Sequence, residues 1–252
     1  MALQQDGGNP MTETIGIYKK GNDVLRIIRD TDPCDPRTEF DNVGHMACWH
    51  GRYNLGDKDH DISLHPSEYS DEQAFMEAVR KEYPNIAVLL PLYLYDHSGI
   101  AISVGSSRFQ SIDGMGWDWG WIGVIYATKD DIREQFPVVI SRNPPKYKPR
   151  QFVSNVAIKD AEKVLRSEVE VYDDYLAGRI YGYQRAILEL EPEDLEPHGA
   201  TSLNDLTVSK LTELFHEHAS GMDSFDACYG YYGNASIKDI LDEHGFSEGD
   251  EV

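Results

Sequence analysis

The stretch IAVLLPLYLYDHSGIAISV, residues 86–104, decides the fold that we expect. Residues 86–95 form an unbroken apolar run with the length of a buried strand. The sequence DHSG at residues 96–99 is typical of a tight turn, and residues 100–104 return as the partner strand. Residues 121–127 are a third apolar strand, so we predict a three-stranded antiparallel meander.

Helices are predicted on both sides of this meander along the chain. The sequence SDEQ at residues 70–73 fits a capping box that begins a helix, and Thr128 begins a short helix that ends at Pro137. Over residues 158–176 an apolar residue recurs at every third or fourth position, and Gly178 follows, which predicts a long amphipathic helix. Two further amphipathic helices are predicted in the last quarter of the chain.

The order of these elements determines the expected fold class. Another hairpin is predicted near the N-terminus, with strands at residues 14–18 and 24–28. Strands and helices do not alternate regularly, so a doubly wound parallel sheet is not expected. We predict an α+β fold in which helices pack on one face of an antiparallel sheet. Residues 1–13 are expected to be a flexible tail, residues 14–185 the α+β core, and residues 186–252 an acidic, mainly helical part of the same domain or of a small second domain.

Negative charge is the strongest compositional feature of the chain. The sequence has 44 acidic and 23 basic residues, a formal net charge of −21 at pH 7. Residues 186–252 hold sixteen acidic and two basic residues, so this segment carries −14. Such charge opposes direct binding to nucleic acid and docking on anionic membranes, and it favours partners with basic surfaces. A solvated acidic surface that serves solubility alone is the competing explanation.

Cysteine usage and the length of the apolar segments indicate the compartment. Cys34, Cys48 and Cys228 form no CxxC pair, so reduced thiols are expected rather than a disulfide framework. Residues 1–10 lack the apolar core of a signal peptide, and residues 86–95 are too short to span a bilayer. We therefore expect a cytoplasmic protein that has no membrane partner. The oligomeric state is left open.

Several phrases of the sequence occur together in one family. They are DNVGHMACWH (residues 41–50), RYNLGD (52–57), LPLYLYDHSG (90–99), WDWGWIG (117–123), EVEVYDDY (168–175) and CYGYYG (228–233). With these phrases the chain resembles a family of uncharacterised proteins carried by bacteriophages, prophages and plasmids. No activity is established for that family, so the resemblance transfers no catalytic residue. It implies a mobile-element accessory protein that acts inside a bacterial host cell.

Histidine and aspartate are concentrated in residues 45–61, and two more lie in the turn at 96–99. Imidazole and carboxylate groups are ligands of zinc, manganese and iron, and such a metal can activate water. The candidate metal ligands are His50, His60, Asp96 and His97, and the candidate catalytic residues are His50, Asp57, Asp96 and His97. The spacing matches no known metal motif. Hydrogen bonds that fix two loops are the competing interpretation.

Two other groups of residues are candidates for function. Cys48 and His97 have the side chains of a thiolate and its base, although Cys48 lies in a segment that reads as a strand, and a buried structural thiol is the simpler interpretation. Trp117, Trp119 and Trp121 alternate, which places the three indoles on one side of an extended chain. We expect them to form either a packed aromatic face or an exposed platform for a ligand or partner.

Two functions remain open, and the sequence does not decide whether the protein is an enzyme or which cofactor it holds. The favoured function is counter-defence by binding, in which an acidic surface mimics nucleic acid and occupies a basic surface of a host protein. The candidate partner-binding residues are Glu189, Glu191, Glu193, Asp194, Glu196, Glu213 and Glu217. The alternative is a metal-dependent hydrolase or nuclease that uses the histidine and aspartate cluster.

Overall fold

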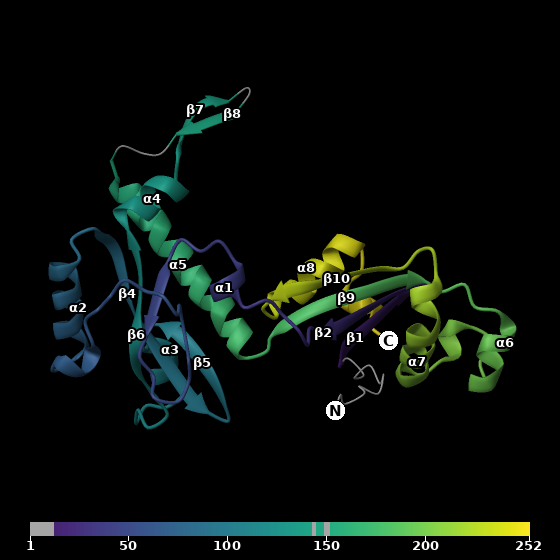
Figure 1. Ribbon diagram of the computed structural model, residues 1–252. Coiled ribbons are helices and arrows are strands. Elements are labelled where there is room, and N and C mark those ends of the chain that lie inside the picture. The colour runs from purple at the N-terminus through teal and green to yellow at the C-terminus, as the bar shows by residue number, and fades with distance from the viewer. Residues whose placement is uncertain (1–12, 143–144, 149–151) are drawn as a thin grey trace, which may run out of the picture. The chain divides into compact units, whose positions relative to one another are not determined.

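The computed structural model describes residues 13–142, 145–148 and 152–252. The chain divides into two compact units (Figure 1): unit 1 is Met1–Pro33 with Gly178–Val252, and unit 2 is Cys34–Ala177. Each unit contains one four-stranded antiparallel sheet, and helices surround both sheets. The predicted α+β class with antiparallel sheets is therefore confirmed.

The sheet of unit 2 contains the predicted hairpin. Strands β4 (Ile86–His97) and β5 (Gly99–Val104) pair from Leu92 with Val104 to His97 with Gly99. Strand β6 (Trp119–Thr128) lies on the other side of β4, and β3 (His45–Cys48) pairs with β6, which gives the order β3-β6-β4-β5. The prediction of a meander was wrong in this respect. Strand β4 is the longest strand of this sheet and lies between β6 and β5. The backbone groups on both of its edges are therefore paired.

Helices cover both faces of this sheet. The long helix α5 (Asn155–Leu176) packs with Met46, Leu92 and Ile125 on one face. Helix α2 (Glu72–Glu82) packs on the other, where Phe75 and Val79 join Ala47, Val124 and Tyr126. The prediction of helices on one face was therefore wrong for unit 2. The unbroken apolar runs of β4 and β6 explain this result, because such strands have hydrophobic side chains on both faces.

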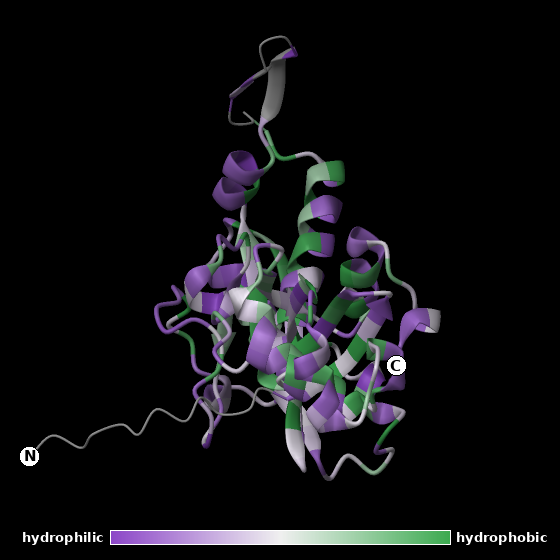
Figure 2. Cartoon of the chain, turned by 90° about the vertical axis from the view of Figure 1, so that its right-hand side faces the viewer, coloured by the Kyte–Doolittle hydropathy of each residue, from purple (hydrophilic) through white to green (hydrophobic). Residues whose placement is uncertain are grey.

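The remaining elements of unit 2 are short. They are α1 (Pro36–Glu39), a 3₁₀ turn (Pro66–Glu68), α3 (Ser107–Gln110), α4 (Lys129–Gln135), β7 (Val138–Arg142) and β8 (Pro145–Lys148). Strands β7 and β8 form an antiparallel hairpin of their own. Figure 2 shows hydrophobic and hydrophilic residues sharing the same helices, as expected of helices that pack on a sheet with one side and face water with the other.

The sheet of unit 1 joins segments that are far apart in the sequence. Its strands are β1 (Thr14–Lys20), β2 (Asp23–Arg29), β9 (Ile180–Ile187) and β10 (Asp226–Tyr232), in the order β1-β2-β9-β10. The predicted N-terminal hairpin is present as β1 and β2. Strand β10 was not predicted from the sequence, because its glycines are atypical of a strand interior.

Two hydrophobic cores lie on opposite faces of this second sheet. On one face Val24 and Ala186 pack with Leu211, Leu214 and Phe215, so helix α7 (Val208–His218) covers it. On the other face the core is completed by helix α8 (Ala235–His244), and its members include Leu25, Ile27, Tyr181, Ile240 and Leu241. Unit 1 also contains α6 (Pro192–Leu195) and four 3₁₀ turns (Glu196–His198, Leu203–Asp205, Ala219–Gly221 and Glu248–Asp250).

Helix ends follow the sequence signals closely. Helix α2 begins one residue later than the capping box predicted, because the carboxylate of Asp71, not the hydroxyl of Ser70, accepts the amide of Ala74 (2.9 Å). Helix α4 has the predicted start, with the full capping box of Thr128 and Asp131. Helix α5 ends where expected, since Gly178 adopts a φ of 64°, which glycine reaches without strain.

The division into units differs from the boundaries predicted from the sequence. Residues 186–252 lie in unit 1 together with the N-terminal hairpin, because β10 pairs with β9 and β9 pairs with β2, from Asp23 opposite Ile187 to Arg29 opposite Tyr181. Local sequence patterns do not report pairing over such a separation. The predicted tail lies outside the described residues except for residue 13. In the described ranges no helix is long and apolar enough to cross a bilayer.

Candidate functional site

A cleft of about 770 Å³ in unit 2 collects much of the predicted histidine and aspartate cluster. Its volume falls in the range of small-molecule sites, roughly 300–1,000 Å³. Of the predicted site residues, His50, Asp57 and His60 line it, and Cys48 lies there too. The other lining residues are Asp35, Thr38, Trp49, Gly51, Tyr53, Asn54, Leu55, Gly56, Lys58, His65 and Tyr172.

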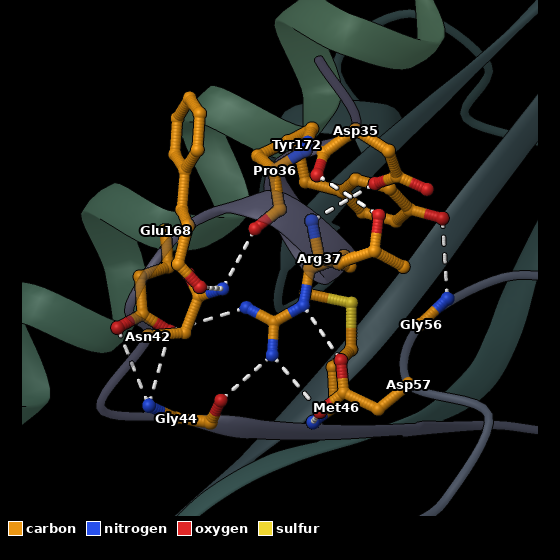
Figure 3. A network of polar contacts seen from close by, with 12 residues as sticks. Asp35, Pro36, Arg37, Asn42, Gly44, Met46, Gly56, Asp57, Glu168 and Tyr172 are labelled. Atoms are coloured by element: carbon orange, nitrogen blue, oxygen red, sulfur yellow. Dashed lines mark hydrogen bonds and ion pairs between the residues drawn. The ribbon is translucent and has the colours of Figure 1, made fainter.

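A buried arginine organises one wall of the cleft (Figure 3). The side chain of Arg37 is only 2% exposed. Its guanidinium donates to both carboxylate oxygens of Asp57 (2.8 and 3.0 Å), to Oε2 of Glu168 (3.2 Å) and to the carbonyl of Gly44 (2.7 Å). The network therefore ties α1, the loop after β3 and helix α5 to one another.

The two carboxylates of this network have further backbone partners. Asp57 accepts the amide of Met46 (2.7 Å), and Glu168 accepts the amides of Val43 (2.7 Å) and Gly44 (3.1 Å). Burial raises the pKa of Glu168 above its usual value despite the nearby arginine. Burial alone would lower the pKa of Arg37, but its hydrogen bond to Asp57 raises it. Asp57, which was predicted as a catalytic residue, is thus held in an ion pair with Arg37.

Gly56 brings the chain close to β3 beside this network. Its φ is 71°, and a Cβ atom at this position would lie 2.5 Å from the carbonyl oxygen of Met46. Its amide donates to the hydroxyl of Tyr172 (3.1 Å), and burial raises the pKa of this tyrosine to about 12. The hydroxyl therefore keeps its proton at neutral pH. Only glycine fits this approach without moving the strand.

Aromatic and imidazole rings form another part of the cleft. The indole of Trp49 makes edge contacts with His60 (5.2 Å between ring centroids), His65 (6.3 Å) and Phe75 (5.4 Å). His50 stacks on Tyr53 (5.1 Å, 11° between the planes). Atom Nδ1 of His60 is buried and makes no hydrogen bond within the described part of the chain. The cleft therefore offers several ring surfaces, while Nδ1 of His60 is enclosed by protein atoms.

The predicted residues of the 96–99 turn lie beside the cleft but do not complete a metal site. Asp96 accepts hydrogen bonds from Tyr53 (3.1 Å) and Arg52 (3.2 Å), while Nδ1 of His97 lies 3.1 Å from the carboxylate of Asp118. Among residues 13–142, 145–148 and 152–252, no three His, Cys, Asp or Glu side chains are grouped as metal ligands. The set His50, His60, Asp96 and His97 is thus not brought together as one ligand cluster.

Cys48 has the environment of a structural thiol. Burial raises its pKa to about 12, and the charge of Asp57 acts in the same direction. A thiolate is the nucleophilic form, so this environment opposes nucleophilic catalysis. The proposed pair of Cys48 thiolate and His97 base is therefore contradicted at the cysteine.

The three alternating indoles do not share one exposed face. Trp119 donates through Nε1 to the carbonyl of Asp113 (2.8 Å), and Trp121 donates to the carbonyl of Gly123 (2.7 Å) and contacts Phe75 (5.3 Å). Both are half-buried, whereas Trp117 is 83% exposed. The packed interpretation therefore holds for two indoles, and only Trp117, which precedes β6, projects into solvent.

The predicted partner-binding acids lie in unit 1 on and beside α6 and α7. Six of them are exposed, and we call these six the α6–α7 acidic surface: Glu189, Glu191, Glu193, Glu196, Glu213 and Glu217. The seventh, Asp194, is half-buried and accepts the amide of Glu191 (2.8 Å), so it caps α6. In the described ranges none of the six forms an ion pair, whereas Asp250, farther along the chain, pairs with Lys20 (3.3 Å).

The chain matches no family model, no curated protein and no solved structure. The resemblance to proteins of mobile elements therefore stays a prediction. The main residues missed by the sequence reasoning are Arg37, Trp49, Lys58 and Tyr172. Trp49 and Tyr172 lie within phrases that were singled out, but nothing in the local sequence indicated that they meet.

Proposed function

We propose that the protein acts by binding, and that its α6–α7 acidic surface occupies a basic, nucleic-acid-binding surface of a partner protein. The observation that carries this proposal is that six exposed carboxylates lie on and beside α6 and α7 without a paired cation in the described residues. Exposed, unpaired carboxylates of this kind resemble phosphates in charge and accessibility. A surface so charged attracts a basic protein over a distance of about 10 Å at moderate ionic strength.

The two helices that carry or flank these carboxylates, α6 and α7, pack on one hydrophobic core. Leu195 of α6 and Leu211, Leu214 and Phe215 of α7 belong to one buried core, which fixes the two elements relative to each other (Figure 1). Lys210 is the nearest base on α7, and its ammonium donates to the carbonyl of His198 (2.6 Å). A lysine in this position secures the turn after α6 and leaves the carboxylates unneutralised.

The setting follows from the resemblance to proteins of bacteriophages, prophages and plasmids. In the cytoplasm of a bacterial host, the basic surfaces that such a protein meets include those of nucleases and restriction enzymes that bind DNA. We propose that the partner is a host defence protein of this kind and that binding blocks its access to DNA. Since the protein itself carries −21, direct binding to nucleic acid is not part of the proposal.

A capture experiment tests this function. The tagged full-length chain and a variant with all six glutamates changed to glutamine are incubated with host lysate, and the captured proteins are quantified by mass spectrometry. A matched control changes six exposed acids of unit 2 instead: Glu39, Asp41, Asp59, Asp61, Glu134 and Glu170. We expect a nucleic-acid-binding protein that is captured by the wild type and the control, lost in the six-glutamine variant, and released by added duplex DNA.

Two results contradict the proposal. One is capture that is equal for the wild type and the six-glutamine variant. The other is a captured partner that duplex DNA does not displace, since a mimic of nucleic acid must compete with it. The alternative of a metal-dependent hydrolase or nuclease has less support, because Asp57 is engaged by Arg37 and no three His, Cys, Asp or Glu side chains of the described residues are grouped as metal ligands.

A further inference from the structure

We propose that the cleft of unit 2 binds a mononucleotide, with the base against its indole and imidazole rings and the phosphate near Lys58. This inference concerns a different unit from the α6–α7 acidic surface and does not depend on it. The cleft is lined by Asp57 of the Arg37 network and by Trp49, His50 and Tyr53.

The first step is that the cleft is held in shape before any ligand arrives. Arg37 joins Asp57 to Glu168 on α5, and Tyr172, one turn farther along α5, holds the amide of Gly56. These contacts link the loop at residues 49–58 to a helix whose own face is buried in the core. A ligand that binds there does not have to order the loop, which reduces the entropic cost of binding.

The rings of Trp49 and His50 are fixed by neighbouring side chains and remain partly accessible. Trp49 and His50 are half-buried, so parts of both rings remain accessible in the cleft. Phe75 and His60 hold the indole by edge contacts, and Tyr53 holds the imidazole of His50 by stacking. Side chains fixed in this way offer planar surfaces on which a heteroaromatic base stacks.

The cleft also has a hydrogen-bond donor and a positive charge available to a ligand. Nδ1 of His50 accepts the amides of Arg52 (3.3 Å) and Tyr53 (3.2 Å), so this imidazole carries its proton on Nε2 and can donate it. Lys58 is exposed and forms no ion pair with any described residue. The carboxylates in the lining are already engaged: Asp57 by Arg37, and Asp35 by the amide of Arg37 (2.9 Å). The lining thus offers free donors and a free cation, which suit an anionic ligand rich in acceptors.

The overall charge of the protein limits the ligand to a small one. A single phosphate needs only the local cation at Lys58, whereas a polynucleotide would run past the exposed Asp59 and Asp61 that follow it. Asp59 also repels a single phosphate at Lys58, but each further phosphate of a chain would add to this repulsion, which acts over about 10 Å at moderate ionic strength. The geometry therefore points to a mononucleotide and not to a nucleic-acid chain.

Titration calorimetry of the full-length protein tests the proposal. The probes are AMP, GMP, CMP and UMP, with adenosine as the base without phosphate and ribose 5-phosphate as the phosphate without base. We expect saturable binding of at least one nucleotide. We also expect adenosine and ribose 5-phosphate each to bind at least about tenfold more weakly than AMP if AMP is that nucleotide, because each lacks one of the two contacts. For another nucleotide, its own nucleoside replaces adenosine.

Two variants and two matched controls assign the binding to the cleft. Lys58→Gln is expected to remove the difference between the nucleotide and its nucleoside, and Trp49→Leu to weaken both by about tenfold. The controls, Lys163→Gln on α5 and Trp117→Leu before β6, lie outside the lining and are expected to leave binding unchanged. Because Lys58 is exposed, its variant stays informative even if Trp49→Leu does not fold.

Three outcomes overturn the proposal. They are no saturable binding of any of the four nucleotides at millimolar concentration, equal affinity for a nucleotide and its nucleoside, and nucleotide binding that Lys58→Gln leaves unchanged.

Discussion

Replacing Arg37 by methionine tests whether the buried network holds unit 2 together. Methionine has a similar length and no charge, so the change leaves Asp57 and Glu168 without their cation and the carbonyl of Gly44 without its donor. The side chains of both acids are largely buried, at 17% and 11% exposed. Removing one partner of a buried ion pair costs about 3–5 kcal/mol. For a chain of this size that corresponds to a fall in Tm of about 6–20 °C.

The assay is urea and thermal unfolding of the full-length chain, followed by circular dichroism. Arg166→Met is the matched control, because Arg166 pairs with Glu162 on the surface of α5, where both side chains are at least 40% exposed. Exposed pairs contribute about 0–1 kcal/mol. If Arg37→Met were no more destabilising than Arg166→Met, the network would not have the role that we assign to it.

The same variant has a characteristic pH dependence. Burial already places the pKa of Glu168 above its usual 4.5 in the wild type, and loss of Arg37 raises it further. A carboxyl whose folded pKa is raised stabilises the fold fully below its unfolded pKa and loses that contribution as pH rises through the folded pKa. The difference in free energy of unfolding between wild type and Arg37→Met should therefore shrink as pH falls from 7 towards 4.5. A difference that grew on acidification would contradict this reasoning.

Three further predictions follow from single contacts. Ellman's reagent should modify the two exposed cysteines of the native protein quickly and Cys48 only after unfolding. The reason is that burial raises the pKa of the Cys48 thiol to about 12. Fast reaction of all three thiols in the native protein would contradict this prediction. The hydrogen bond to Asp131 raises the pKa of His45 above 6.5, so its contribution to stability is complete below pH 6.5 and is lost as pH rises through the folded pKa. Urea unfolding of His45→Gln over a pH series should lack that loss. Gly56→Ala should destabilise unit 2 by more than about 1 kcal/mol, since its Cβ would clash with backbone at a positive φ, and thermal unfolding at wild-type Tm would refute this.

Local structure was predictable wherever one short segment contains the whole signal. The turn at residues 96–99 lies between its own two strands, and the capping box of Thr128 and Asp131 spans four residues. The apolar stripe of α5 likewise belongs to one helix, and the residues that the stripe identified, such as Leu165 and Val169, are buried. In each case the free energy that decides the structure comes from neighbours in the sequence.

The arrangement of these pieces was not predictable in the same way. Strand β6 can pair either with β5 or with the edge of β4 that β5 leaves free, and the apolar sequences of β4 and β5 suit both arrangements. Which arrangement forms depends on how well it buries the strands. Strand β10 contains glycine and tyrosine in place of branched residues, and its pairing partner β9 lies about forty residues away. Pairing over such distances depends on packing of the whole unit, which a local pattern does not encode.

The candidate site shows the same limit. The density of histidine and aspartate correctly drew attention to the loop that lines the cleft, since His50, Asp57 and His60 lie there. The ion pair of Asp57 was not predicted, because its partner, Arg37, lies twenty residues earlier, and the second acid of the network, Glu168, lies 131 residues beyond Arg37. From the sequence alone, an arginine in a short polar segment is expected to be a solvated charge, and only the fold shows that Arg37 is buried.

The two proposed binding surfaces differ in how the fold treats their negative charge. In unit 2, Arg37 pairs with Asp57 at the cleft. In unit 1, Lys20 and Arg185 pair with Asp250 and Asp23. The α6–α7 acidic surface receives no such compensation. Glu213 and Glu217 lie four residues apart on one helix, where a lysine at the second position would stabilise α7 by about 0.2–0.5 kcal/mol and a second glutamate destabilises it by a similar amount. The fold thus compensates the buried acids of the Arg37 network and leaves a local repulsion on the α6–α7 acidic surface. A cationic partner would relieve that repulsion, so binding there would gain free energy from it.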